Sequence, residues 1–350
     1  LIGLVGSEMC IRDRWERTGQ FDIGLDLGLF NNRLRITTDY YKKKTTDLLY
    51  SVAVPATSGY QTMLKNIGSI ENQGYELSIE SDNLTGAFSW TTAFNIAFNR
   101  NKVLELGGEE YKEMAEGDGH LKTGSVRRLI VGEPIGVFYG YRFDGIFQNE
   151  EECKQQTSSA SPIGVGLRRY KDLNGDGKVD AANDREILGD ANPKFFGGLT
   201  NTFAYKGFEL NVFLQYSYGN KILNYNAMEL ENPTGGQNAY ADMVNRWTPE
   251  NPSNIYPKAT TNRALLVSDR FIEDGSYLKL KTLSLSYSFP KINLKHIQGL
   301  RLYVTGQNLL TWTKYRGYDP EVSYRGASTL EAGEDFGGYP QSRTFMFGIK

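Results

Sequence analysis

Several segments of this chain alternate apolar and polar residues over lengths of about ten to fourteen residues. Successive side chains of a β-strand point to opposite faces of the sheet, so this pattern predicts strands with one apolar and one polar face. The chain is therefore predicted to be all-β. In the clearest run, residues 86–100, one face is made up of Phe88, Trp90, Thr92, Phe94, Ile96 and Phe98.

Nine strands are predicted, and the connections between them alternate between short and long. The strands are expected at 19–30, 33–46, 69–81, 86–100, 194–205, 208–220, 276–289, 300–312 and 342–350. The short connections are Asn31–Asn32, 81–85, Lys206–Gly207 and 290–299, and the long ones are 47–68, 101–193, 221–275 and 313–341. Gly136 to Gln148 also has strand character, but counting it in the sheet would break the alternation. It is therefore assigned to the excursion 101–193, outside the sheet.

The alternation of connections favours an antiparallel transmembrane β-barrel over a soluble sandwich. Both folds place every second residue against apolar surroundings, but only a membrane barrel sorts long extracellular loops from short periplasmic turns. An aromatic content of 13% suits the girdles and lipid-facing strands of such a barrel. A mean hydropathy of −0.46, without any apolar run of about 18 residues, excludes a helical membrane protein. The net charge of −2 gives no basic surface for nucleic acid.

Nine strands alone would leave two unpaired edges, which a bilayer does not tolerate. We therefore expect the chain to be part of a larger barrel. Residues 1–14 are expected to be non-native, because Ser7 to Arg14 resembles a translated sequencing adapter, and the native part is then 15–350. The chain has two cysteines, Cys10 and Cys153, so no disulfide framework is predicted and Cys153 is expected to be an unpaired thiol in a polar loop.

Separate blocks of sequence, in the same order along the chain, resemble the SusC/RagA family of TonB-dependent outer-membrane transporters. The resemblance covers essentially everything after Arg14. The blocks are Gly68–Leu77, Gly132–Tyr141, Asp144–Gln148, Phe271–Leu280, and Gly306–Thr311 with Tyr318–Val322.

The resemblance implies a 22-stranded barrel with an N-terminal plug in the outer membrane of a Gram-negative cell. This chain would supply its last nine strands. By resemblance, such a barrel imports glycans, oligosaccharides or peptides, with a SusD-like surface lipoprotein as lid and a TonB complex acting through an N-terminal part that this chain lacks. Family members end on a strand with a terminal aromatic residue, whereas this chain ends at Gly348, Ile349 and Lys350, which implies a clipped end.

One segment of the excursion 101–193 carries explicit ligand chemistry. Oxygen-bearing side chains at positions 1, 3 and 5 of a loop, Gly177 at position 6 and a carbonyl at position 7 match the front of an EF-hand calcium loop. The back departs from it, because position 12 is Asn183 and the acid falls one residue later. A turn cluster held by side-chain hydrogen bonds without metal is the alternative. The predicted ligands of a structural Ca²⁺ are Asp172, Asn174, Asp176, Lys178 (through its carbonyl), Asp180 and Asp184.

No catalytic constellation is predicted, and the chain is not expected to be an enzyme. His120 and His296 have no Ser or Cys partner at suggestive spacing, and Gly197–Gly198 lacks the following helix of a phosphate cradle. Glu109, Glu110 and Asp242 are expected to be loop charges. Aromatic residues could stack on sugar rings or pack within the loops: Tyr139, Tyr141, Tyr240, Trp247, Trp312 and Tyr315.

Two other classes of function stay open. A passive porin would share the barrel but would have no plug. A calcium-stabilised surface binding protein would share the Asp172 loop without needing the alternation of long and short connections.

Overall fold

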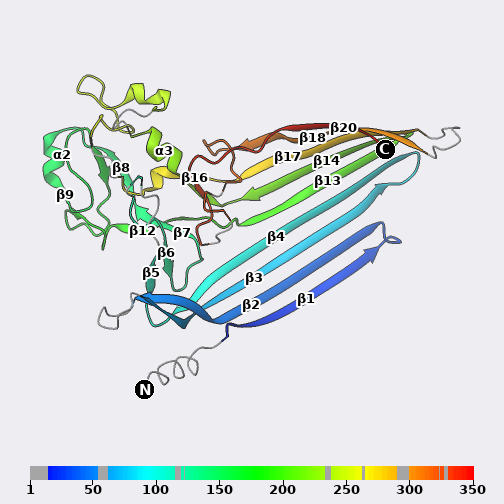
Figure 1. Cartoon of the computed structure of the whole chain (residues 1–350), viewed down its shortest axis with the longest axis horizontal. Helices are drawn as coiled ribbons and strands as arrows, with labels where there is room; N and C mark the ends of the chain where they lie inside the picture. Colours follow the sequence, from blue (N-terminus) through cyan, green and yellow to red (C-terminus); the bar gives the residue numbers. More distant parts are fainter. Residues whose placement is uncertain are drawn as a thin grey trace, which may run out of the picture.

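The computed structural model describes residues 15–53, 62–114, 120–121, 123–232, 238–261, 265–289, 299–322, 324–326 and 330–350. Nine long strands form one antiparallel sheet in the order β1-β2-β3-β4-β13-β14-β17-β18-β20 (Figure 1). All nine predicted strands are therefore confirmed. Their bounds are β1 Arg17–Leu29, β2 Leu34–Ala53, β3 Thr62–Leu84, β4 Phe88–Leu106, β13 Phe195–Tyr205, β14 Phe208–Tyr218, β17 Tyr277–Phe289, β18 Leu300–Thr313 and β20 Thr344–Ile349.

Tight turns join the strands at one end of the sheet. Between β13 and β14 the turn is Lys206–Gly207, with φ of 46° and 90°. Two successive positive φ values match the twist of the flanking strands, and glycine adopts them without steric cost. Between β1 and β2, Phe30, Asn31 and Asn32 all have φ between 55° and 62°. The predicted short connection 290–299 lies almost entirely outside the described residues.

The predicted long connection 47–68 is wrong, because β2 and β3 continue well into it. The two strands pair from Leu34–Ser81 as far as Ala53–Thr62. The register shifts between Thr45 and Leu48, next to Asp47 at a φ of 58°. A bulge of this kind interrupts the alternation of side chains, so the sequence pattern ends while the strand continues.

Near the tight turns, side chains sort between the two faces of the sheet. One row of cross-strand partners, from β4 to β20, is entirely apolar, and the row next to it is polar from β4 to β18. The polar row is Thr91, Thr202, Asn211, Ser284 and Thr305. The apolar row is Trp90, Phe203, Leu210, Leu285, Val304 and Phe347.

The apolar face has little to pack against in this chain. Phe21, Ile23 and Leu25 of β1 are all more than half exposed, as are Phe208 of β14 and Phe347 of β20. A soluble protein would lose the free energy of burying these side chains, about 1.5–3 kcal/mol each. Lipid would cover them at no such cost, so the sheet is the wall of a membrane β-barrel.

Three long excursions leave the sheet at the end opposite the tight turns. They comprise residues 107–194, 219–276 and 314–343, and we call their described parts the loop body. Figure 1 shows the loop body gathered at one end of the sheet. Its elements are β5 Tyr111–Glu113, β6 Arg128–Ile130, β7 Val137–Tyr141, β8 Phe143–Ile146, α2 Glu150–Gln155, β9 Thr157–Ser158, β10 Arg168–Tyr170, β11 Lys178–Val179, β12 Arg185–Asp190, β15 Lys221–Asn224, α3 Tyr225–Leu230, η2 Ala241–Asn245, η3 Asp269–Phe271, β16 Ile272–Asp274 and β19 Glu334–Asp335.

The segment Gly136 to Gln148 lies outside the wall, as predicted. Its strands β7 and β8 pair with β12 and β10, all within the first excursion. No helix among the described residues is long and apolar enough to cross a membrane.

Changing one side chain on each face tests the assignment of the two faces. Val212→Lys is expected to lower the free energy of unfolding in lipid vesicles by about 2–4 kcal/mol, because Val212 is near the middle of β14 on the same face as Leu210, where a lysine meets hydrocarbon. The matched control is Asn211→Lys, one residue along β14 on the polar face. It is expected to cost about 1 kcal/mol, for the lost hydrogen bond to Thr202.

Both variants are measured in the full-length protein by urea titration in vesicles. Equal losses for the two variants would contradict the assignment of the faces.

Candidate functional site

The loop body has one shared core, although its residues come from distant parts of the chain. The first excursion contributes Val126, Phe138 and Leu188, and the second contributes Leu223, Met228 and Phe271. Phe336 of the third excursion packs against the same cluster. Strand pairing also joins the second and third excursions. β15 of the second excursion pairs on one side with β16 of the same excursion and on the other with β19 of the third. The three excursions therefore fold as one unit and not as independent loops.

A buried ion pair ties the first excursion to the third. Arg127 and Glu334 are each 2% exposed, with 2.9 Å between Nε and Oε1. Arg127 also donates hydrogen bonds to the carbonyl oxygens of Gly136, at 2.7 Å, and Ala332. Its guanidinium lies 4.2 Å from the centre of the Phe138 ring. Removing one partner of such a pair leaves a buried charge and costs about 3–5 kcal/mol.

A second buried carboxylate forms ion pairs with two arginines. Glu231 is 1% exposed and pairs with Arg270 at 2.6 Å and with Arg316 at 2.8 Å. Arg316 also pairs with Glu273 at 2.8 Å. Sequence reasoning found none of these residues, since the partners are up to 85 residues apart and carry no local signal.

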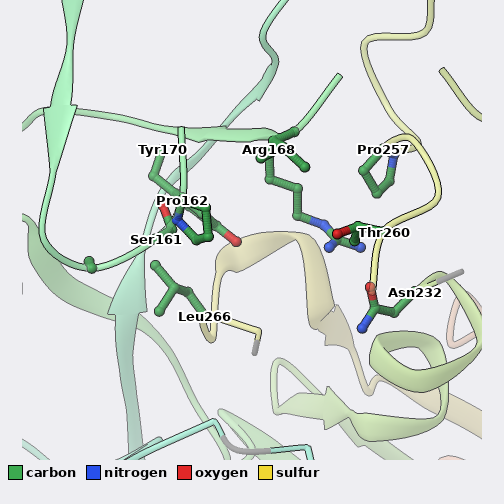
Figure 2. A pocket seen from close by; sticks show the side chains of 10 residues that line it. Ser161, Pro162, Arg168, Tyr170, Asn232, Pro257, Thr260 and Leu266 are labelled. Carbon is green, nitrogen blue, oxygen red and sulfur yellow. The ribbon is translucent and has the colours of Figure 1, made fainter. Parts of the chain in front are cut away.

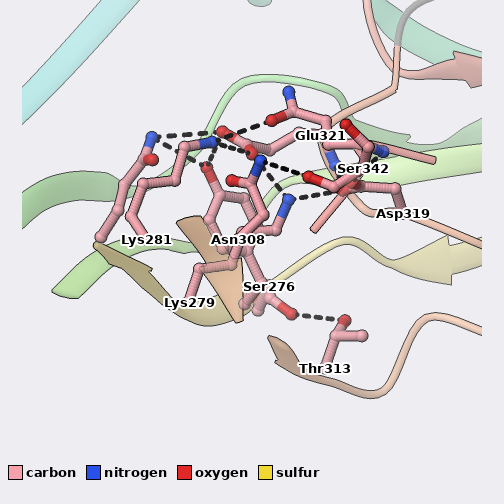
Figure 3. Close-up of polar contacts among 11 residues, drawn as sticks. Ser276, Lys279, Lys281, Asn308, Thr313, Asp319, Glu321 and Ser342 are labelled. Carbon is pink, nitrogen blue, oxygen red and sulfur yellow. Dashed lines mark hydrogen bonds and ion pairs between the residues drawn. The ribbon is translucent and has the colours of Figure 1, made fainter. Parts of the chain in front are cut away.

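The third excursion is fastened to the wall by lysines at the loop end of β17 (Figure 3). Lys279, only 2% exposed, lies 2.6 Å from Asp319 Oδ1 and 2.6 Å from Glu321 Oε2. Lys281 reaches the same Glu321 oxygen at 2.9 Å, and the Tyr277 hydroxyl donates to Oε1 at 3.1 Å. Burial acts to raise the pKa of Glu321, but its bonds to the two lysines outweigh burial and bring that pKa down to about 2.

The predicted calcium loop is compact, and five of its six proposed ligands, all but Lys178, hold its backbone through side-chain hydrogen bonds. Asp172 accepts from the backbone N–H of Gly175 at 2.7 Å and of Gly177 at 2.6 Å. Asp184, fully buried, accepts from Leu173 N–H at 2.8 Å and Asp180 N–H at 2.7 Å. Asp184 thus closes the loop from one residue beyond the usual position. Gly175 and Gly177 have φ of 76° and 82°, a conformation that favours glycine.

The remaining proposed ligands lie on the exposed side of the same loop. Asn174 donates to Asp176 at 3.0 Å, and Lys178 Nζ pairs with Asp180 at 3.1 Å. The hydrogen bond from Lys178 is the main cause that lowers the pKa of Asp180.

The loop contains the oxygen ligands that Ca²⁺ prefers, and hydrogen bonds hold their present arrangement. Three carboxylates and an amide from Asp172, Asn174, Asp176 and Asp184 are brought into one turn, and oxygen is the donor atom that Ca²⁺ prefers. Within the described ranges, no three Asp, Glu, His or Cys side chains are arranged to hold a metal ion. The residue types fit Ca²⁺, and binding would exchange hydrogen bonds such as Asp172 to Gly175 for metal ligation.

The predicted aromatic residues are mostly packing residues. Tyr141 packs against Tyr170 with tilted rings whose centres are 5.7 Å apart, and Tyr315 is 5% exposed with its hydroxyl bonded to Asp335. Tyr240 packs against the shared core, and Trp247 donates to Gln148 at 3.1 Å. Tyr139 lies under the guanidinium of Arg128 at 3.9 Å. Of the six, Trp312 alone is largely exposed, at 51%.

The other candidate residues from the sequence lie among ordinary hydrogen-bonding or packing neighbours. His120 lies 3.5 Å from Glu229, and His296 is outside the described residues. Asp242 accepts from the Tyr256 hydroxyl at 3.4 Å. Gly197 lies in β13, where a Cβ atom would meet the Asn95 carbonyl oxygen at 2.1 Å. Close strand packing therefore accounts for this glycine.

Together, the wall with its apolar outer face and the loop body at one end define an outer-membrane β-barrel. Residues 12–309 match the family described as TonB dependent receptor-like, beta-barrel. The chain belongs to this family and lies in the outer membrane of a Gram-negative bacterium.

Several known proteins are similar to it. TonB-dependent receptor P3 of Formosa agariphila is 41% identical over 343 residues, which cover 96% of this chain and 34% of that protein. TonB-dependent receptor SusC of Bacteroides thetaiotaomicron is 29% identical over 96% of this chain and 32% of its own length. The solved structure of the RagAB peptide transporter matches with a TM-score of 0.76 at 27% identity, over 96% of this chain and 35% of that one. The chain therefore spans about a third of the length of these relatives.

Acid is expected to loosen the third excursion from the wall. The pKa of Glu321 is lower in the folded protein than its ordinary value of 4.5, so its pairing stabilises the fold above pH 4.5 and is lost as the pH falls toward 2. The loss amounts to about 3 kcal/mol at most. The protection factors of residues 314–322 against hydrogen exchange in the full-length protein, each referred to the intrinsic exchange rate at the same pH, measure this loss from pH 6 to pH 2.5.

Glu321→Gln is expected to flatten this pH dependence. Glu331→Gln is the matched control, since Glu331 is 4.0 Å from Arg325 and has no contact with the wall lysines. If the Glu321→Gln protein keeps the acid-induced loss of protection in residues 314–322, this account of the contact between the third excursion and the wall is wrong.

Proposed function

We propose that this chain forms part of the wall and the loop body of an outer-membrane transporter that imports glycans, oligosaccharides or peptides. The observation that carries the proposal is the likeness to SusC and to the RagAB peptide transporter over nearly the whole chain, wall and loop body together. A loop body with its own core, fastened to the wall by buried ion pairs, suits an extracellular surface that receives cargo. Energy would come from a TonB complex acting on parts of the transporter other than this chain.

A SusD-like surface lipoprotein is the proposed lid. The loop body presents large exposed side chains that a partner could cover, among them Tyr318 at 79%, Tyr339 at 96% and Val244 at 77%. Exposed aromatic residues of this kind are common anchors in protein interfaces.

Uptake in living cells separates active import from its alternatives. Deleting the gene is expected to reduce the uptake of fluorescently labelled oligosaccharides or oligopeptides to background, and restoring the full-length gene is expected to recover it. Removing TonB from otherwise intact cells is expected to abolish the same uptake.

Two results would contradict the proposal. Uptake that continues without TonB would identify a passive porin. Binding of cargo at the cell surface, without uptake into wild-type cells, would identify a surface binding protein.

We also propose that the Asp172 loop binds a structural Ca²⁺ in the extracellular medium. The residues that support it are Asp172, Asn174, Asp176, the Lys178 carbonyl, Asp180 and Asp184. A bound ion would stabilise the first excursion, since ordering so long a connection costs conformational entropy.

Calorimetric titration of the full-length protein with Ca²⁺ tests this site. Asp176→Ala is expected to weaken binding at least tenfold, because it removes one anionic ligand from the exposed side of the loop and leaves the bonds of Asp172 and Asp184 in place. Asp242→Asn, elsewhere in the loop body, is the control and is expected to leave binding unchanged. An unaltered affinity in Asp176→Ala would show that the loop is a hydrogen-bonded turn without metal.

A further inference from the structure

A small cavity in the loop body lies between the first and second excursions. One side is formed by β10 and the residues before it, including Ser161, Pro162 and Arg168. The other side is formed by the second excursion, including Asn232 and Pro257. Its volume is about 100 Å³, enough for a small polar group but not for a whole sugar ring or peptide. Figure 2 shows the Arg168 side chain extending toward the second excursion, near Asn232.

Arg168 brings an incompletely paired guanidinium into this cavity. Its Nη2 donates to the backbone carbonyl of Glu231 at 3.0 Å, but its Nε is buried and has no hydrogen-bond partner among the residues that the structure describes. A guanidinium has five N–H donors, and leaving a buried one unpaired costs free energy. Within the described part of the chain, no carboxylate forms an ion pair with Arg168.

The charges around Arg168 explain why it has no anionic partner. Glu231 is the nearest carboxylate along the second excursion, but its two oxygens are already taken by Arg270 and Arg316. Arg316 takes Glu273 as well. Among these five residues the three arginines face only two carboxylates, so one positive charge remains without a counter-charge. Burial lowers the pKa of Arg168, and the charge of Arg270 acts in the same direction.

Asn232 adds a hydrogen-bond acceptor to the same cavity. Its side-chain oxygen is buried, has no hydrogen-bond partner in the described ranges, and belongs to a residue that lines the same cavity. The cavity therefore presents an unpaired cationic donor from one excursion and an unpaired acceptor from another. A group that satisfies both carries an anionic oxygen beside an O–H or N–H.

We propose that this cavity is a subsite for a carboxylate group of the cargo, with Arg168 pairing with the carboxylate and Asn232 accepting a hydrogen bond from the adjacent hydroxyl or amide N–H. A planar guanidinium matches the geometry of a carboxylate, and such charge-assisted pairs are stronger than neutral hydrogen bonds. Two kinds of cargo carry this chemistry: an acidic sugar, in which hydroxyls neighbour the carboxylate, and a peptide C-terminus, in which an amide N–H does. The inference rests on the proposed import function and narrows its cargo.

Direct binding to the full-length transporter in detergent tests the subsite. The probes are glucuronate and N-acetylglycine, and their uncharged counterparts are glucose and N-acetylglycinamide. Calorimetry or ligand-observed NMR is expected to detect at least one of the two carboxylates, with at least tenfold weaker binding of its uncharged counterpart. The carboxylate that binds more tightly identifies the source, sugar or peptide.

Substitutions locate the binding. Arg168→Gln is expected to weaken carboxylate binding at least tenfold, and Arg168→Lys less than that, because lysine keeps the charge but loses the planar fork. Arg169→Gln is the matched control: Arg169 is adjacent in sequence but pairs with Asp144 at 2.9 Å and Glu152 at 3.4 Å. Each variant is checked for native folding by its heat-modifiable mobility on gels.

The inference is overturned if neither carboxylate binds at millimolar concentration, or if Arg168→Gln binds as well as wild type. Because binding is read without transport, this failure is distinct from failure of the proposed function. Loss of TonB-dependent uptake with carboxylate binding intact would overturn the function and leave the subsite standing.

Discussion

The antiparallel hydrogen-bond ladder of the wall is the constraint on which the rest of this protein depends. In hydrocarbon, each backbone N–H and C=O without a partner costs several kcal/mol, so the strands must pair along their whole length. From β2 to β18 every wall strand has a neighbour on both sides, and pairing continues in register over as many as thirteen residues between β1 and β2. Once pairing fixes the register, the alternation of side chains decides which residues meet lipid.

The loop body depends on a different balance of forces. Its core is small and apolar, but charges such as Arg127 and Lys279 are buried at its joints, between excursions or against the wall. Buried ion pairs add little net stability, because desolvation offsets their attraction, yet a wrong arrangement leaves a charge unpaired and is strongly disfavoured. We infer that these pairs select one arrangement of three long excursions. Arg168 departs from this rule, since its counter-charge is not supplied by the described chain.

The candidate sites differed in how far sequence could predict them. The predicted calcium loop is local: its candidate ligands from Asp172 to Asp184 lie within thirteen residues, so spacing alone proposed them, and the structure shows Asp184 bonded back to the start of the loop. Arg168 and Asn232 are far apart in the sequence and belong to different excursions. Neither stands in a motif, and only packing of the two excursions shows that both line one cavity.

Sequence by itself determined the nine wall strands and the two faces of the sheet, because period-two alternation is a local property of extended backbone. It failed where the ladder bulges near Asp47, since a bulge shifts the alternation while the pairing continues. Tertiary structure alone decided that the excursions share one core and that Arg127 meets Glu334. Such contacts join residues up to about two hundred positions apart. Burial and charge balance decide which residues meet, and no local sequence pattern records either.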